Sequence, residues 1–147
     1  MTGRSCVVLL LALLAASPAL AQTSPAGRIK SVAGEAFVIR QGQRVTAAVG
    51  TPVYEQDSLA TGPDSRVGVT LRDDTRLSIG PQTTIEISRF VYAQSDSQFA
   101  FVLKVVRGVV AYVSGRIAKL SPDAVRLETP SAIVGVRGTR VVIRVGA

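Results

Sequence analysis

The chain has 147 residues, with 17 Lys and Arg against 10 Asp and Glu, no His, and a formal net charge of +7. Its only cysteine is Cys6. This composition excludes a disulfide within the chain and any nucleophile that depends on a neighbouring His.

The first residues have the pattern of a secretory signal peptide. Arg4 precedes an apolar stretch from Val7 to Ala16, and Ser17–Ala21 supplies a Pro break and a small-x-small cleavage pattern. The apolar stretch is about half of the roughly 20 residues that a membrane span needs. Cys6 precedes this stretch, whereas a lipid-accepting Cys would follow it. We therefore expect residues 1–21 to be removed and the protein to be periplasmic or secreted.

The remaining sequence predicts a short polar lead-in, residues 22–26, and a single domain over residues 27–147. Without Arg4, 16 cations face 10 carboxylates, a net charge of +6, and 13 of the cations are Arg. A basic surface favours anionic partners such as polysaccharide, lipid headgroups or an acidic protein face. Because export is expected, we expect no nucleic acid partner. No second apolar run is long enough to predict a transmembrane span after residue 21.

Apolar residues alternate with polar ones in short bursts at 67–71, 77–79 and 85–87, and again between 99 and 127. Alternation with a period of two is typical of strands with one buried face. The sequence therefore predicts an all-β domain of short stacked strands, either β-solenoid-like or sandwich-like. The similar lengths and spacings of the first three bursts favour the stacked rungs of a solenoid.

Residues with turn chemistry separate the bursts. Gly62 lies in the stretch TGPDS, Asp73 and Asp74 in RDDT, and Gly108 in RGV. Gly, Pro and Asp are the residues that tight turns require, so we predict structural turns at these positions. Adjacent carboxylates in a turn bond their own backbone, which argues against Asp73 and Asp74 as a catalytic or Ca²⁺ pair.

The stretch IVGVRGTRVVIRV, residues 133–145, changes the parity of its apolar residues. Val134 and Val136 are even, whereas the later apolar residues Val141, Ile143 and Val145 are odd. A continuous strand cannot change parity without an extra residue. We therefore predict a bulge or tight corner with structural roles for Gly135 and Gly138. A phosphate-binding loop is excluded, because it needs more glycines, a following helix and a Lys-Ser/Thr pair.

Several of these residues, in this order, resemble the FecR domain family over about residues 27–145. The family patterns are D-x-L-x-T-G-x-x-S, D-G-T/S-x-L-x-L, G-x-V and T-P-x-A-x-x-G-x-x-G-T. They are matched by Asp57, Leu59, Thr61, Gly62 and Ser65; by Asp73, Asp74, Thr75, Leu77 and Ile79; by Gly108 and Val110; and by Thr129, Pro130, Ala132, Gly135, Gly138 and Thr139. Asp74 stands where the family usually has Gly.

The resemblance implies a module of the cell envelope. The family's namesake is a periplasmic sensor that receives a signal from an iron-siderophore receptor and passes it to a cytoplasmic sigma factor. This chain resembles only the periplasmic part, so we expect a binding or scaffold module, linked to envelope or iron-uptake signalling, and not a complete regulator.

Two functions follow as hypotheses. The first is docking of an envelope protein on exposed strand edges. The second is binding of an anionic envelope polymer, lipopolysaccharide or peptidoglycan, through Arg126, Arg137, Arg140 and Arg144. We expect no enzymatic activity, no cofactor and no metal, because no catalytic spacing is met; Lys119 near Ser114 and Ser121 is the local Ser-Lys candidate.

Overall fold

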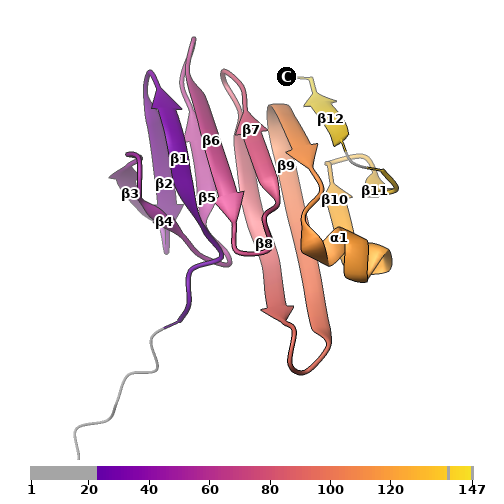
Figure 1. Cartoon of the computed structure of the whole chain (residues 1–147). Helices are drawn as coiled ribbons and strands as arrows, with labels where there is room; N and C mark the ends of the chain where they lie inside the picture. Colours follow the sequence, from indigo (N-terminus) through magenta and orange to yellow (C-terminus); the bar gives the residue numbers. More distant parts are fainter. Residues whose placement is uncertain (1–22, 139, 147) are drawn as a thin grey trace, which may run out of the picture.

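The computed structural model of the chain describes residues 23–138 and 140–146 (Figure 1). The expected signal peptide, residues 1–21, and Thr139 of the last motif lie outside the described residues. The strands are β1 (Gly27–Ala33), β2 (Ala36–Arg40), β3 (Gln43–Thr46), β4 (Pro52–Val53), β5 (Ser58–Thr61), β6 (Arg66–Leu71), β7 (Arg76–Ile79), β8 (Thr84–Ala93), β9 (Gln98–Val113), β10 (Val125–Glu128), β11 (Ile133–Gly135) and β12 (Arg140–Val145). A helix α1 (Arg116–Leu120) and a 3₁₀ turn η1 (Pro122–Ala124) lie between β9 and β10.

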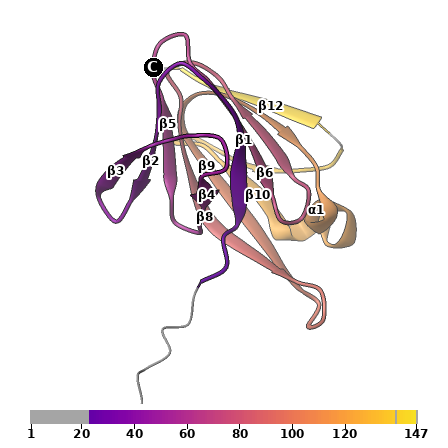
Figure 2. The same cartoon turned by 60° about the vertical axis from the view of Figure 1, so that its left-hand side comes forward.

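The strands form one antiparallel sheet that curls into two facing halves (Figures 1 and 2). Sheet A contains, in order, β4, β1, β6, β7, the C-terminal part of β9 and β12. Sheet B contains β3, β2, β5, β8, the N-terminal part of β9, β10 and β11. The pairing of β9 with β10 is the parallel exception. The all-β class is confirmed, and β9 joins the two halves because it belongs to both.

The three similar bursts of the sequence favoured the stacked rungs of a solenoid, but the strand pairing does not form such rungs. The bursts at 67–71 and 77–79 become β6 and β7, which pair as an antiparallel hairpin in sheet A. The burst at 85–87 lies in β8, which belongs to sheet B. The three bursts are similar in length and spacing because the chain makes a hairpin turn after the first burst and crosses to the other sheet after the second. Of the two arrangements predicted, the facing halves correspond to the sandwich-like one.

Alternate residues of each strand fill the space between the two halves. The alternation places Leu77 and Ile79 from sheet A, and Ile85, Ile87 and Leu103 from sheet B, at 2% exposure or less. Burying one such side chain contributes about 1.5–3 kcal/mol relative to its exposed state. The core therefore rests on the period of two that the sequence shows.

Aromatic rings close one part of this core. The ring of Phe101 stacks on that of Tyr112 with centroids 6.0 Å apart, and meets Phe90 edge-on at 6.1 Å. Both arrangements are favoured by the ring quadrupoles. Since Phe101 and Tyr112 lie in the two parts of β9, this contact joins the sheet B end of the strand to its sheet A end.

Four crossings between the halves lie side by side, at Gly34–Glu35, Gly62–Ser65, Gly80–Thr83 and Gly108–Val109; we call them the corner row. Backbone bonds join neighbouring crossings. Gly62 N–H donates to Glu35 O at 3.0 Å, Gln82 N–H to Gly62 O at 3.0 Å, and Gly80 N–H to Val109 O at 2.9 Å. These hydrogen bonds therefore join the four crossings into a short ladder. The bonds run across the direction that the chain takes in each crossing.

The second and third crossings share one sequence, Gly-Pro-x-Ser/Thr. Pro fixes the second position, and the third has positive φ (58° at Asp64 and 48° at Gln82), as a type II turn requires. The hydroxyls of Ser65 and Thr83 then make equivalent bonds, each donating to its own Pro carbonyl. Each also accepts a backbone N–H that follows a positive-φ glycine, from Glu35 at 2.9 Å and from Val109 at 3.0 Å.

We expect Thr83→Val to lower the free energy of unfolding by about 1–3 kcal/mol. Val has the shape of Thr but no oxygen, so the Val109 N–H would be left without its acceptor in a buried corner. The neighbouring Thr84→Val is the matched control and should change stability by less than about 0.5 kcal/mol, because Thr84 is half-buried on the outer side. Urea unfolding measures both; equal losses would contradict the role of the corner hydroxyl.

Candidate interaction groove

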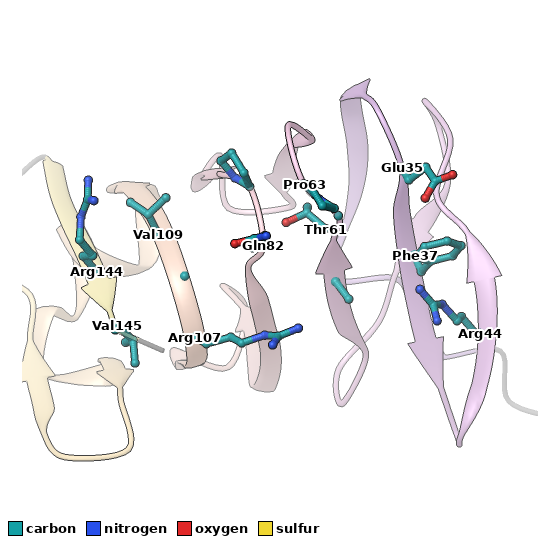
Figure 3. A pocket seen from close by; sticks show the side chains of 15 residues that line it. Glu35, Phe37, Arg44, Thr61, Pro63, Gln82, Arg107, Val109, Arg144 and Val145 are labelled. Carbon is teal, nitrogen blue, oxygen red and sulfur yellow. The ribbon is translucent and has the colours of Figure 1, made fainter.

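A groove of about 900 Å³ runs past the corner row (Figure 3). Its lining comes from five strands and from all four crossings. The residues are Glu35, Phe37, Arg44, Ala60, Thr61, Gly62, Pro63, Pro81, Gln82, Arg107, Gly108, Val109, Arg144, Val145 and Gly146. The β2–β3 hairpin lies at one end and the end of β12 at the other. The groove therefore extends from the edge strand β3 of sheet B to the edge strand β12 of sheet A.

The charges of the groove are mostly positive. Arg44, Arg107 and Arg144 line it, against the single carboxylate of Glu35. The guanidinium of Arg44 lies 3.6 Å from the ring centre of Phe37, which is half-buried. The stacked guanidinium and ring together form a flat surface that is both apolar and positively charged. An extended segment with acidic side chains is the occupant that such a lining fits.

Two of the predicted turn residues contribute to this groove. Gly62 is half-buried in the turn between β5 and β6 and has room for a side chain. Gly108 lies inside β9 with φ of 95°, at the point where the strand leaves sheet B for sheet A. A Cβ at Gly108 would collide with the backbone and side chain of Thr83. Gly108 therefore allows both the bend of β9 and its close approach to the corner row.

Asp73 and Asp74 occupy the β6–β7 turn, but their side chains differ in burial and in the groups that they contact. Asp73 is fully buried and accepts hydrogen bonds from Thr75 N–H, from the Thr75 hydroxyl at 2.7 Å, and from Ile117 N–H at 3.3 Å. Asp74 takes the positive φ of 67° and makes an exposed ion pair with Arg116 at 3.2 Å. The turn thus holds the start of α1 against sheet A through the Asp73 carboxylate.

The two glycines of the last motif lie in two different settings. Gly135 is not a turn or bulge residue: it is the last residue of β11 and pairs with Arg126 of β10, without a positive φ. Gly138, with φ of 132°, lies between β11 and β12. Parity changes here because β11 belongs to sheet B and β12 to sheet A, so the corner is a passage between sheets and not an extra residue within one strand.

The four C-terminal arginines do not line one surface. Arg126 and Arg137 line a hollow of about 420 Å³ with Asp123, beside β10 and β11. Arg140 and Arg144 are exposed on β12, where alternation puts them on the same face. Arg144 also lines the groove.

Sequence reasoning missed the ion pair that fixes the turn before β5. Arg40 and Asp57 form a two-pronged salt bridge, with Nε–Oδ1 at 2.9 Å and Nη2–Oδ2 at 2.7 Å. Asp57 is buried and also accepts the Tyr54 N–H at 2.9 Å, while the Arg40 guanidinium lies over the Tyr54 ring at 4.4 Å. Asp57 belongs to a family motif, but Arg40 precedes it by 17 residues, and no local pattern links them.

The Ser-Lys combination around Lys119 lines one hollow but is not hydrogen-bonded as a catalytic pair. Ser114 and Lys119 line the same hollow of about 380 Å³. The Ser114 hydroxyl donates to the carbonyl of Gly138 at 2.6 Å. Within residues 23–138 and 140–146, no three His, Cys, Asp or Glu side chains gather as a metal site would need. The same residues contain no helix with the length and apolar character to span a membrane.

Comparison with known families agrees with this architecture. The family model described as FecR protein matches residues 57–147, more than half of the chain, so the chain belongs to the FecR family. The matched region contains three of the crossings of the corner row and all strands from β5 onward. No curated protein and no solved structure matches the chain.

Alanine substitutions at three glycines should separate the stability cost of backbone strain from the cost of a steric clash of the added Cβ. Gly108→Ala combines positive φ with a clash against Thr83, so we expect a loss of about 3 kcal/mol or more. Gly42→Ala has positive φ but open space, which isolates backbone strain of about 1–2 kcal/mol. Gly135→Ala has neither and should be close to neutral. Chemical unfolding gives the order, and a large loss at Gly135 would contradict its placement.

The two neighbouring aspartates should respond differently to the same substitution. Asp73→Asn replaces one buried acceptor oxygen by an NH₂ that faces other donors, so we expect a loss of about 1–3 kcal/mol. Asp74→Asn keeps a side chain that tolerates positive φ and removes only an exposed ion pair, worth less than about 1 kcal/mol. Thermal unfolding midpoints measure the difference; similar midpoints for both variants would refute the buried role of Asp73.

Proposed function

We propose that the protein is a non-enzymatic, exported interaction module of the cell envelope, which holds an extended segment of a partner protein in the groove. Membership of the FecR family supports a role related to envelope signalling. The signal peptide pattern of residues 1–21 supports export to the periplasm or beyond. The partner is an envelope protein, and the module acts as its scaffold or receiver.

The observation that carries the proposal is the shape of the groove. It is elongated, it is lined by glycine-rich backbone and two prolines, and it ends at two edge strands. All four residues of β3 are exposed, and Val45 is 52% exposed. A partner segment could pair with such an edge and continue along the groove, with its carboxylates facing Arg44, Arg107 and Arg144.

The chemistry of the described residues supports a role without catalysis. The Ser114 hydroxyl is bound to a backbone carbonyl. The carboxylates of Asp57 and Asp73 are occupied by structural hydrogen bonds.

Site-specific photo-crosslinking tests the proposal. A photoreactive residue at Gln82, which is exposed in the groove, should give a discrete protein adduct in intact envelopes. The same residue at Ser95, exposed at the tip of the β8–β9 hairpin, is the control and should give none. Adding Arg107→Glu should reduce the Gln82 adduct several-fold by placing like charges against an acidic segment. Absence of an adduct at Gln82, or equal adducts at both positions, would contradict the groove as a docking site.

A further inference from the structure

The outer face of sheet A carries an uncompensated positive charge. Every described strand residue that is charged in sheet A is a cation, and all of these are exposed: Arg28, Lys30, Arg66, Arg76, Arg140 and Arg144. The strand segments of this sheet, residues 27–33, 52–53, 66–71, 76–79, 108–113 and 140–145, contain no Asp or Glu. Within the described part of the chain, none of the six forms an ion pair.

The outer face of sheet B differs in that its strands carry carboxylates as well as cations. There Ser58 is in register with Glu86, Glu86 with Lys104, and Lys104 with Glu128. At this register position cation and carboxylate therefore alternate across neighbouring strands. The strands of sheet B carry six cations, Arg40, Arg44, Arg89, Lys104, Arg107 and Arg126, against Glu86 and Glu128, so only sheet A has strand cations with no carboxylate among them.

Strand register organises the cations of sheet A. Arg28 is in register with Thr70, Thr70 with Arg76, Arg76 with Val113, and Val113 with Arg140. We call this the arginine row. Its members lie on β1, β7 and β12, so two strand spacings, about 10 Å, separate each from the next. Arg66 and Arg144, near the corner row end of β6 and β12, supply further positive charge along the strands.

A strip of small residues lies next to the arginine row. Ser31 is in register with Gly68, Gly68 with Ser78, and Ser78 with Ala111. These residues line a shallow trough of about 410 Å³, with Arg66 on its rim. Large side chains are missing from the strip, so a ring could lie against the sheet there, and the hydroxyls of Ser31 and Ser78 could bond to it.

We infer that the outer face of sheet A binds an extended anionic polysaccharide that crosses the strands, with its carboxylates on the arginine row and its sugar rings in the trough. Guanidinium groups pair with carboxylates in a planar, two-pronged geometry. A polymer with one uronate in each disaccharide has a charge spacing of the same order as the arginine row. A peptide strand would instead pair along an edge, parallel to the strands and not across them.

This inference goes beyond the proposed function and does not rest on it. None of the three members of the arginine row lines the groove. It also differs from a patch of the four C-terminal arginines: Arg140 takes part in the row, but Arg126 and Arg137 lie beside β10 and β11, away from it.

Calorimetric titration with hyaluronan oligosaccharides, which carry one carboxylate per disaccharide, tests the inference. The triple variant Arg28→Gln, Arg76→Gln, Arg140→Gln should lose affinity by about tenfold or more. The matched control, Arg89→Gln, Lys104→Gln, Arg126→Gln, removes the same three charges from exposed strand positions of sheet B and should bind as the unaltered protein does. If the control loses as much affinity as the triple variant, total charge and not this face is responsible, and the inference fails.

A charge-neutral variant and two other ligands complete the test. Ser78→Leu fills the trough without altering charge and should also weaken hyaluronan binding, with circular dichroism checking the fold. Unchanged binding by Ser78→Leu would overturn the role of the trough. Dextran, which is uncharged, should not bind. Phosphatidylglycerol vesicles or duplex DNA binding as tightly as hyaluronan would overturn the choice of a polysaccharide, since charge alone would then suffice.

Discussion

The fold depends on buried hydroxyl groups that hold the two halves of the sheet at their corners. Thr83 ties Pro81 to Val109, and Ser65 ties Pro63 to Glu35. A chain that crosses between sheets must turn its backbone away from the ladder, and the freed N–H groups then need other acceptors. In the corner row these two hydroxyls accept the N–H groups of Glu35 and Val109, and carbonyls of neighbouring crossings accept others. The groove follows this row, because residues of all four crossings line it.

The same principle explains why parts of the structure were predictable and others were not. Alternation identified β6, β7 and the later strands, because burial of one face leaves a period of two in the sequence. It could not show that β6 and β7 pair as a hairpin while β8 joins the opposite sheet, since a turn and a crossing both use Gly and Pro. Residues 133–145 illustrate the limit: their parity change was visible, but whether it marked a bulge or a change of sheet depends on which strands they pair with.

The candidate surfaces were harder to predict than the fold. Gly62 and Gly108 were identified as turn residues, yet nothing local indicates that they line a groove with Phe37 and Arg144. Likewise, Arg40 and Asp57 meet only because β2 and β5 are neighbours. The C-terminal arginines lie close together in the sequence, but their strands carry them to different sheets. Proximity along the chain is therefore a poor guide to shared surface where consecutive strands belong to different sheets.

Because β1 and β2 precede residue 57, where the family match begins, the boundary of the match is not the boundary of the sheet. β1 pairs with β6, and β2 pairs with β5, so both of these partners are interior strands in the whole molecule. A fragment that began at the family boundary would expose both as bare edges, with open backbone groups and apolar flanks. Such edges recruit other chains, so the early strands also cover two edges at which copies of the protein would otherwise pair.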